Sequence, residues 1–180
     1  EVQFYATRGY GVIQMDYRGS TGYGRKEMIL ANHQMGKKMQ EDKYDALMWA
    51  NDQGYVDMDN VCISGASYGG YAAMQAATKN PELFKCIIAY VGVYDLTSMD
   101  LRGLQWSELG MPMEYIEKGD PRDPDDYKNL YENSPLFFAE NIEDPILIIT
   151  GRRDTQVRFQ ETVDMVNELK KYNKDYKYII

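Results

Sequence analysis

Residues 61–71 read Val61-Cys62-Ile63-Ser64-Gly65-Ala66-Ser67-Tyr68-Gly69-Gly70-Tyr71, a short apolar run followed by a glycine-rich turn. The run from Asn60 to Ser64 predicts a strand apolar enough to be buried on both faces. The alanine-rich stretch from about Tyr68 to Lys79, stopped by Asn80-Pro81, predicts a helix. Between the two, residues 65–69 fit Gly-x-Ser-x-Gly, a pattern that points to a nucleophile when a strand precedes it and a helix follows it.

Ser67 is the predicted nucleophile of this turn. To stand above the sheet it must occupy a sharp, strained bend, and strand and helix then approach so closely that Gly65 and Gly69 must be small, with Gly70 loosening the packing further. The backbone N–H of Tyr68 lies at the amino end of the helix, where it would bind an oxyanion; one such donor is worth about 3–4 kcal/mol of barrier. A phosphate-binding loop is the alternative, but its Gly-x-Gly-x-x-Gly or Gly-Lys-Ser pattern is missing from this turn.

Outward from this turn, short apolar strands alternate with amphipathic helices. The helices are predicted over about 37–53, ended by Gly54, over 68–79 and from Phe159 through Val163, Val166 and Leu169; the other strands are predicted over 11–17, 85–91, 145–150 and 176–180. Such alternation implies right-handed crossovers and a mostly parallel sheet with helices on both faces. Residues from roughly 95 to 142 hold four of the six prolines, Pro112 among them, and are predicted to form a partly helical excursion over the carboxyl edge of the sheet. The fold class is therefore α/β, of the α/β-hydrolase type, with residues 1–180 forming a partial catalytic domain that is truncated at both ends.

Composition narrows the function classes. The chain has 180 residues and a net charge of −8, and no run of Lys or Arg suggests a nucleic-acid or anionic membrane partner. Cys62 and Cys86 sit among β-branched residues and are interpreted as buried core thiols, not as a disulfide or a metal site. A single histidine argues against zinc, so no metal and no cofactor is predicted. The apolar runs are too short to span a bilayer, and neither the compartment (cytoplasm or periplasm) nor the oligomeric state follows from the sequence.

A serine nucleophile needs a base and a carboxylate that orients the base. Two aspartates follow predicted strands, where catalytic groups of parallel sheets collect: Asp154 after the strand over 145–150, and Asp95 after the strand over 85–91. We prefer Asp154, because Gly151 opens a tight turn that would aim it back toward Ser67. Either aspartate could instead cap the next helix, although the helix after Asp154 begins only near Phe159.

The histidine of the triad is missing from its expected place. His33 is the only histidine, and it precedes Ser67 in a polar segment that predicts a surface position. In the chain order Ser, Asp, His, the base should follow the last strand, beyond Ile180. The simplest interpretation is a truncated domain whose base lies outside these residues; a homologue without a base, or one with a different base, are the alternatives.

These motifs resemble those of the prolyl oligopeptidase family of serine peptidases over nearly the whole chain. The resemblance rests on Asp16-Tyr17-Arg18-Gly19-Ser20 through Gly24, on Gly54-Tyr55-Val56-Asp57, on Ser67-Tyr68-Gly69-Gly70-Tyr71, on Ser134-Pro135-Leu136 and on Gly151-x-x-Asp154-x-x-Val157. It favours dipeptidyl- or acylaminoacyl-peptidase-like members. The chain differs from the family pattern at two positions: Thr150 stands where the family usually has His, and Arg158 where it usually has Pro. Arg158 could alter substrate preference.

The resemblance implies an enzyme that hydrolyses short peptides through an acyl-enzyme. It implies Ser67 and Asp154 in the triad, the Tyr68 N–H as one oxyanion donor with the second upstream of residue 1, and Gln156 as a donor to a substrate carbonyl. It further implies that Tyr68, Val91, Tyr94 and Val157 line the pocket for the residue before the scissile bond, with core packing as the alternative. The family's β-propeller would lie outside this chain. An esterase on the same scaffold and a non-catalytic binding module are the competing functions.

Overall fold

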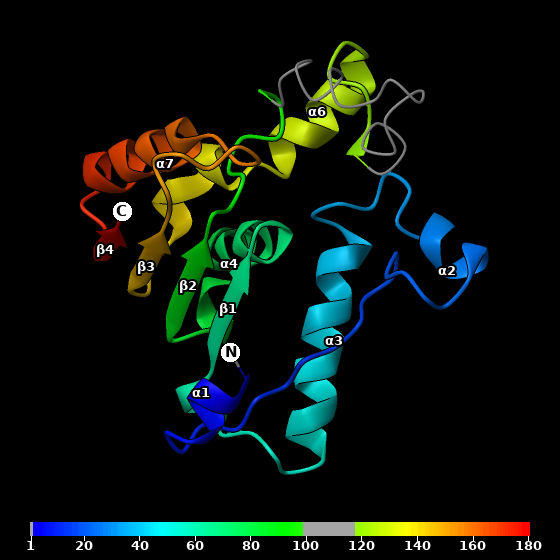
Figure 1. Cartoon of the computed structure of the whole chain (residues 1–180), viewed down its shortest axis with the longest axis vertical. Helices are drawn as coiled ribbons and strands as arrows, with labels where there is room; N and C mark the ends of the chain where they lie inside the picture. The colour runs from blue at the N-terminus through cyan, green and yellow to red at the C-terminus, as the bar shows by residue number, and fades with distance from the viewer. Residues whose placement is uncertain (1, 99–117) are drawn as a thin grey trace.

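The computed structural model of the protein describes residues 2–98 and 118–180. The described residues are arranged around one β-sheet. Within those residues it has four strands: β1 (Cys62–Ala66), β2 (Cys86–Tyr90), β3 (Ile146–Ile149) and β4 (Tyr176–Ile179). They lie in the order β1-β2-β3-β4 and every neighbouring pair is parallel (Figure 1). The predicted parallel sheet is therefore confirmed, since each strand returns to the same direction through a helical connection.

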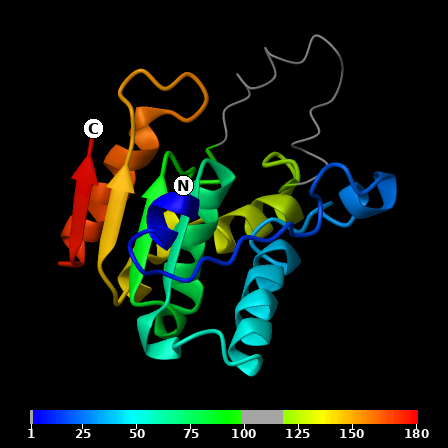
Figure 2. The same ribbon diagram turned by 60° about the horizontal axis from the view of Figure 1, so that its bottom comes forward.

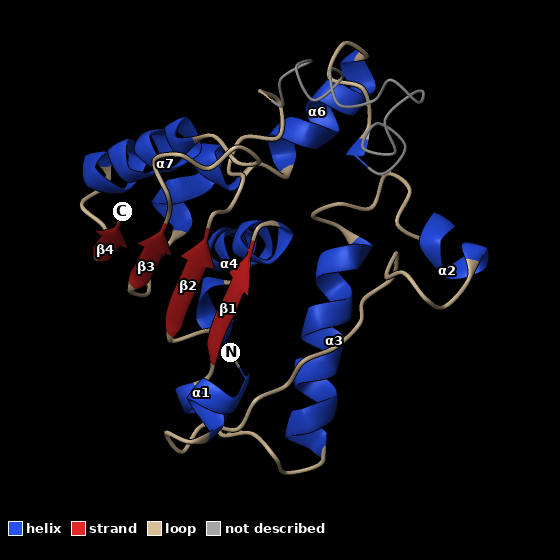
Figure 3. Cartoon of the chain, in the orientation of Figure 1, coloured by secondary structure: helices blue, strands red, loops and turns tan. Residues whose placement is uncertain are grey.

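The helices follow the predicted pattern (Figure 3). The longer ones are α3 (Lys38–Asp52), α4 (Tyr68–Lys79), α6 (Pro124–Glu132) and α7 (Phe159–Lys171). Short turns of helix complete the described chain: α1 (Val2–Ala6), α2 (Arg25–Ile29) and the 3₁₀ segments η1 (Met58–Asn60), η2 (Pro81–Leu83) and η4 (Pro135–Asn141). In α7 the apolar side chains that are fully buried in the core are Met165 and Leu169. Phe159, Val163 and Val166, from which the helix was also predicted, are only half-buried.

One face of the sheet carries the main core. Alternate residues of the central strands point to the same side, and those on this side are fully buried, as expected for period-two strands. Figure 2 shows α4 and α7 behind the sheet on that side, with α1 in front of β1. The cluster is formed by Ala73, Met74 and Ala77 of α4, Ile87 and Ala89 of β2, Ile146 and Ile148 of β3, and Met165 and Leu169 of α7, together with Tyr94, Ala139 and Ile142.

The prediction that the strand before Ser67 is buried on both faces is wrong. Cys62, Ser64 and Ala66 are exposed, and only the intervening residues are half-buried. Among the described strands β1 stands at the edge of the sheet, and its outer face meets α1 through a hydrogen bond of 3.2 Å between the Tyr5 hydroxyl and Ser64 Oγ. A short apolar run has the same sequence signal in either setting, so its length could not distinguish them.

The interpretation of the two cysteines as buried free thiols is also wrong. Cys62 and Cys86 form a disulfide between β1 and β2. The parallel register places the two residues directly opposite each other, with their Cα atoms 4.7 Å apart, on the open face of the sheet. Cys62 is exposed and Cys86 is half-buried. Sequence neighbours alone could not reveal this, because the pairing depends on the register of two strands.

Residues 11–17, predicted as a strand, form none of the strand pairs of the described chain. Val12 and Ile13 are 39% and 49% exposed. A strand forms where its backbone groups pair with a neighbouring strand. Residues 11–17 pair with none of the described strands, although β1 lies at the edge of the sheet, so the apolar alternation alone did not predict sheet pairing there.

The excursion predicted over roughly 95–142 is described at its two ends. Its second part forms α6 and η4, and η4 packs on α4 and α7. The start of α6 follows from its residues, because Asp123 accepts the backbone N–H groups of Asp125 and Asp126 and Pro124 occupies the first turn. Pro112 lies outside the described residues.

Candidate active site

Ser67 stands alone between β1 and α4, in a backbone conformation that residues with a side chain rarely adopt. Its φ is 55° and its ψ is −116°. Two backbone bonds hold it there: Ser67 N–H donates to the Tyr90 carbonyl (2.9 Å), and Tyr71 N–H donates to the Ser67 carbonyl (3.0 Å). Such a conformation costs on the order of 1–3 kcal/mol and persists only where the surroundings enforce it.

The glycines explain how strand and helix approach. A Cβ on Gly65 would lie 2.6 Å from the carbonyl carbon and oxygen of Gly69, and a Cβ on Gly70 would lie 2.5 Å from the Tyr90 carbonyl oxygen. A Cβ on Gly69 would meet nothing within 4 Å. The expectation for Gly65 therefore holds, whereas Gly70 and not Gly69 is the second position that needs a glycine for space.

Tyr68 begins α4, so its backbone N–H lies at the amino end of a helix, where negative charge is favoured. Its ring is half-buried between two other tyrosines, 5.1 Å from the Tyr17 ring and 5.7 Å from the Tyr71 ring, centroid to centroid. Tyr71 is fully buried, which raises the pKa of its hydroxyl, and that hydroxyl donates to the Asn133 carbonyl (2.9 Å). The first turn of α4 is thus held from outside by the Tyr17 ring, which packs on Tyr68, and by the bond from Tyr71 to Asn133.

Asp154 lies in a tight turn after β3. Its N–H donates to the Gly151 carbonyl (3.2 Å), and its Oδ1 accepts the N–H groups of Gln156 (2.8 Å) and Val157 (2.9 Å). Oδ2 accepts no hydrogen bond among the described residues. Asp154 does not cap α7, whose cap position is Arg158. One oxygen of Asp154 is therefore held by the backbone and the other is not.

Asp95, the alternative acid, also bonds to the backbone of its own turn. Its Oδ1 accepts from the Thr97 N–H (2.8 Å), the Thr97 hydroxyl (2.6 Å) and the Ser98 N–H (3.2 Å). This carboxylate closes its own turn after β2, a local bonding pattern typical of aspartate. Asp154 is bonded in the same local way, so hydrogen bonding does not distinguish the two candidates. Their positions do, because Asp154 lines a hollow at the carboxyl ends of the strands and Asp95 is not among its lining residues.

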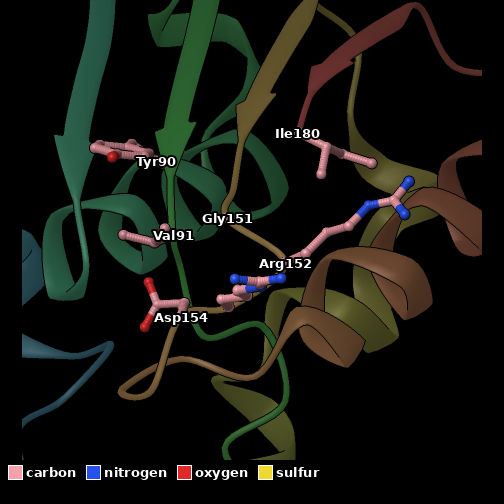
Figure 4. A pocket seen from close by; sticks show the side chains of 7 residues that line it. Tyr90, Val91, Gly151, Arg152, Asp154 and Ile180 are labelled. Carbon is pink, nitrogen blue, oxygen red and sulfur yellow. The ribbon is translucent and has the colours of Figure 1, made fainter.

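A hollow of about 640 Å³ opens at the carboxyl ends of the strands (Figure 4). Its lining is formed by Tyr90, Val91, Gly151, Arg152, Arg153, Asp154 and Ile180. In Figure 4, Val91 and Asp154 lie toward one end and Ile180 toward the other. Of the site residues predicted from the sequence, Val91 and Asp154 line this hollow. Ser67 does not line it, but its N–H donates to the carbonyl of Tyr90, which does.

The other predicted pocket residues lie elsewhere. Tyr94 is 0% exposed and belongs to the core, where burial raises the pKa of its hydroxyl, and Val157 is 8% exposed. Gln156 is exposed. Packing is therefore the role that the structure gives Tyr94 and Val157 directly. Val91 adds a feature that no sequence pattern signals: its φ of 44° is unusual for a β-branched residue.

Glu161 is a buried residue near the site that no sequence pattern predicts. Although 6% exposed, its carboxylate accepts the N–H groups of Tyr94 (2.9 Å) and Asp95 (3.1 Å) through Oε2. Arg158 Nη2 donates to Glu161 Oε1 (3.2 Å) and to the carbonyl and hydroxyl of Ser98 (3.3 and 3.1 Å). The start of α7 thus holds the segment that follows β2, through Glu161 at residues 94–95 and through Arg158 at Ser98.

The remaining sequence expectations concern metals, membranes and His33. In the described part of the chain no group of three or more His, Cys, Asp or Glu side chains could hold a metal ion. None of the helices described is both long and apolar enough to cross a bilayer. His33 is 49% exposed and its Nδ1 lies 3.3 Å from Asp126 Oδ1, so it is at the surface as predicted.

Comparison with known proteins gives consistent results. A sequence model of the prolyl oligopeptidase family matches residues 1–180. Dipeptidyl aminopeptidase BIII of Pseudoxanthomonas mexicana is 36% identical over 181 residues, which cover 99% of this chain and 26% of that protein. Dipeptidyl peptidase family member 6 of Caenorhabditis elegans is 34% identical over 175 residues, covering 96% of this chain and 24% of that protein.

Solved structures agree with the sequence matches. The acylaminoacyl peptidase of Pyrococcus horikoshii superposes with a TM-score of 0.77 at 25% identity, over 91% of this chain and 26% of the other. The predicted α/β-hydrolase fold is thereby confirmed. The chain spans about a quarter of the length of the curated relatives it matches.

Proposed function

This chain belongs to the prolyl oligopeptidase family of serine peptidases, and we propose that it carries the nucleophile and the acid of an enzyme that hydrolyses short peptides. Ser67 is the nucleophile and Asp154 the acid of a Ser-Asp-His triad. The observation that carries the proposal is the backbone of Ser67, held at φ 55° between β1 and α4. That geometry raises a serine side chain above the carboxyl edge of a parallel sheet, where reacting groups collect.

The proposed reaction is acyl transfer in two steps. Ser67 Oγ attacks the carbonyl carbon of the scissile peptide bond and passes its proton to the base. The C–N bond then breaks, and the amine leaves with that proton while the acyl group stays as an ester on Ser67. Water, deprotonated by the same base, hydrolyses the ester. We propose that the base is a histidine in the residues that follow Ile180.

Asp154 supports this role through its two oxygens. The Gln156 and Val157 N–H groups hold Oδ1, at 2.8 and 2.9 Å, so the carboxylate cannot turn freely. Oδ2 is then the oxygen that would accept the N–H of the imidazole and stabilise the imidazolium formed during attack. Asp154 also lines the hollow that ends at Ile180, which is where residues following Ile180 would bring that imidazole.

The substrate carbonyl would be bound by donors near Ser67. The Tyr68 N–H at the start of α4 is the proposed oxyanion donor, and the exposed amide of Gln156 is the proposed donor to a second substrate carbonyl. Tyr68 and Val91 are the proposed walls of the pocket for the residue before the scissile bond. Tyr94 and Val157 would support that pocket from the core.

Hydrolysis assays on the full-length protein test the nucleophile. Short chromogenic peptide amides and short acyl esters are compared for wild type and Ser67→Ala. We expect amide turnover that Ser67→Ala reduces by several orders of magnitude. Ester turnover without amide turnover would establish an esterase instead, and no turnover of either would favour a non-catalytic homologue. A Ser67→Ala variant with wild-type activity would refute the assignment.

A matched pair of variants tests the acid. Asp154→Asn and Asp95→Asn each replace a carboxylate by an amide of the same size, and each keeps an oxygen for the backbone donors. We expect Asp154→Asn to lower kcat by about 10⁴-fold, as loss of the orienting carboxylate does in other triads. Asp95→Asn should keep kcat within a few-fold of wild type. The reverse result would move the acid to Asp95.

A further inference from the structure

Lys43 of α3 lies against two aromatic residues beside the proposed nucleophile. One belongs to the segment that precedes α3, and the other belongs to α4. Lys43 Nζ is 3.9 Å from the centroid of the Tyr17 ring and 5.0 Å from the centroid of the Tyr68 ring. The two rings are 5.1 Å apart and inclined by 31°. One ammonium group therefore contacts two rings from different parts of the chain, and the second of these rings belongs to the residue that follows Ser67.

The surroundings of Lys43 offer little other stabilisation for its charge. The side chain is half-buried, and its one hydrogen bond among the described residues goes to the Met39 carbonyl of the same helix (2.6 Å). The adjacent carboxylate, Asp42, is committed to Arg18, accepting from both its backbone N–H (2.9 Å) and its Nε (2.8 Å). The negative faces of the two rings are consequently the main partners of this ammonium.

Burial makes this placement unfavourable for the charged form. Desolvation lowers the pKa of Lys43 to about 8, although the negative charge of Asp42 acts in the opposite direction. The groups that act on Lys43 are Asp42 and the Met39 carbonyl on α3, the Tyr17 ring on the segment before α3, and the Tyr68 ring on α4. The charge of Lys43 is therefore kept at a cost in folding stability, and the groups that its ammonium contacts are the rings of Tyr17 and Tyr68.

We propose that Lys43 is a positioning residue, whose ammonium ties the Tyr68 ring to Tyr17 and so holds the first turn of α4 in place. The inference rests on the proposed function, because the Tyr68 N–H is the proposed oxyanion donor. Ser67 keeps its strained φ of 55° only if its neighbours are held firmly. The Ser67 N–H bond to Tyr90 holds one side of the turn, and the contact between Lys43 and Tyr68 holds the other.

Steady-state kinetics of the full-length protein test the inference, with three variants. Lys43→Met keeps the length of the side chain without the charge, Lys43→Arg keeps a cation that can stack on rings, and Lys38→Met is the control on an exposed position of the same helix. We expect Lys43→Met to lower kcat by about tenfold, the rate equivalent of one desolvated cation–π contact, with KM within about twofold. Lys43→Arg should recover most of kcat, and Lys38→Met should match wild type.

The pH profile distinguishes this role from a merely structural one. As the pH passes about 8, Lys43 loses its charge, so the kcat of wild type should fall there and that of Lys43→Met should not. Wild-type kcat and an unchanged profile in Lys43→Met would overturn the inference. So would a Lys43→Arg variant as impaired as Lys43→Met, or a loss of kcat that merely follows a lower unfolding midpoint.

A structural readout separates this inference from the proposed function. Crystal structures of wild type, Lys43→Met and Lys43→Arg should show the Tyr68 ring displaced from Tyr17 in the methionine variant only. An unmoved ring in Lys43→Met would refute the positioning role whatever the activity. If wild type shows no Ser67-dependent hydrolysis, the proposed function fails, and the ring position still decides whether Lys43 holds Tyr68.

Discussion

Lys43→Met should stabilise the folded protein at neutral pH, by an amount that depends on pH. Desolvation lowers the pKa of Lys43 from 10.5 to about 8. A difference of about 2.5 pKa units corresponds to about 3 kcal/mol between the folded and unfolded states. Because the folded state holds this proton less tightly, the cost is fully present below pH 8. It falls as the pH rises from about 8 toward 10.5, where the unfolded chain also loses the proton.

The difference in unfolding free energy between Lys43→Met and wild type isolates this effect. Packing differences between methionine and neutral lysine add a constant, and all other titrating groups occur in both proteins and cancel. We therefore expect the advantage of Lys43→Met to shrink by up to about 3 kcal/mol between pH 7 and pH 10.5. The figure of about 3 kcal/mol is the largest change expected, because the half-buried side chain keeps some contact with water, which weakens the effect of burial.

Urea unfolding of the full-length protein at several pH values between 7 and 10.5 provides the measurement. Lys38→Met, at an exposed position of α3, is the control and should give a difference from wild type that does not change with pH. A flat difference for Lys43→Met as well would show that the ammonium is solvated and that the reasoning from burial is wrong. A difference that grew with pH would contradict the sign of the effect.

Three further predictions concern the framework of the site, and each is measured as a change in unfolding free energy. The disulfide between Cys62 and Cys86 closes a loop with a sequence separation of 24, so reduction or Cys62→Ser should cost about 3 kcal/mol; a protein equally stable with and without reductant would contradict this. Gly65→Ala should cost about 1–3 kcal/mol or more, because the new Cβ would lie 2.6 Å from the backbone of Gly69; Gly69→Ala is the control, and equal costs for the two would argue against the close approach. Glu161→Ala leaves two backbone N–H groups without their acceptor and should cost about 2–3 kcal/mol, whereas Glu161→Gln keeps an oxygen there and should cost clearly less; if alanine and glutamine cost the same, the buried bonds contribute nothing.

Much of the fold was predictable because its signals are local. The strand before Ser67 and the helix after it follow from the apolar run, the glycines and the alanine-rich stretch within twenty residues of chain. The helices α3 and α7 follow from apolar periodicity, since a helix that packs on a core must present one apolar face. The alternation of these elements then implies a parallel sheet, because parallel neighbours require a crossover between them.

Residues of the candidate site were predictable where they stand at the end of such a local pattern. Ser67 occupies the turn of a five-residue motif, and Asp154 follows the end of β3. Glu161 could not be found in this way. It lies in the first turn of α7, where an acidic residue is ordinary, and only the folded chain shows that it accepts two N–H groups from the segment after β2.

The sequence by itself determined the order of the four paired strands and of the helices between them, the parallel sheet and the place of Ser67 in a strand-to-helix turn, because neighbours along the chain encode each of these. It wrongly predicted a further strand over residues 11–17. Tertiary structure alone decided that Cys62 meets Cys86, that one face of β1 stays open, and that Lys43 lies over Tyr17 and Tyr68. The physical reason is that strand register and helix packing are set by the whole core. A contact between residues distant in the chain is then a consequence of that packing, and no pattern near either residue records it.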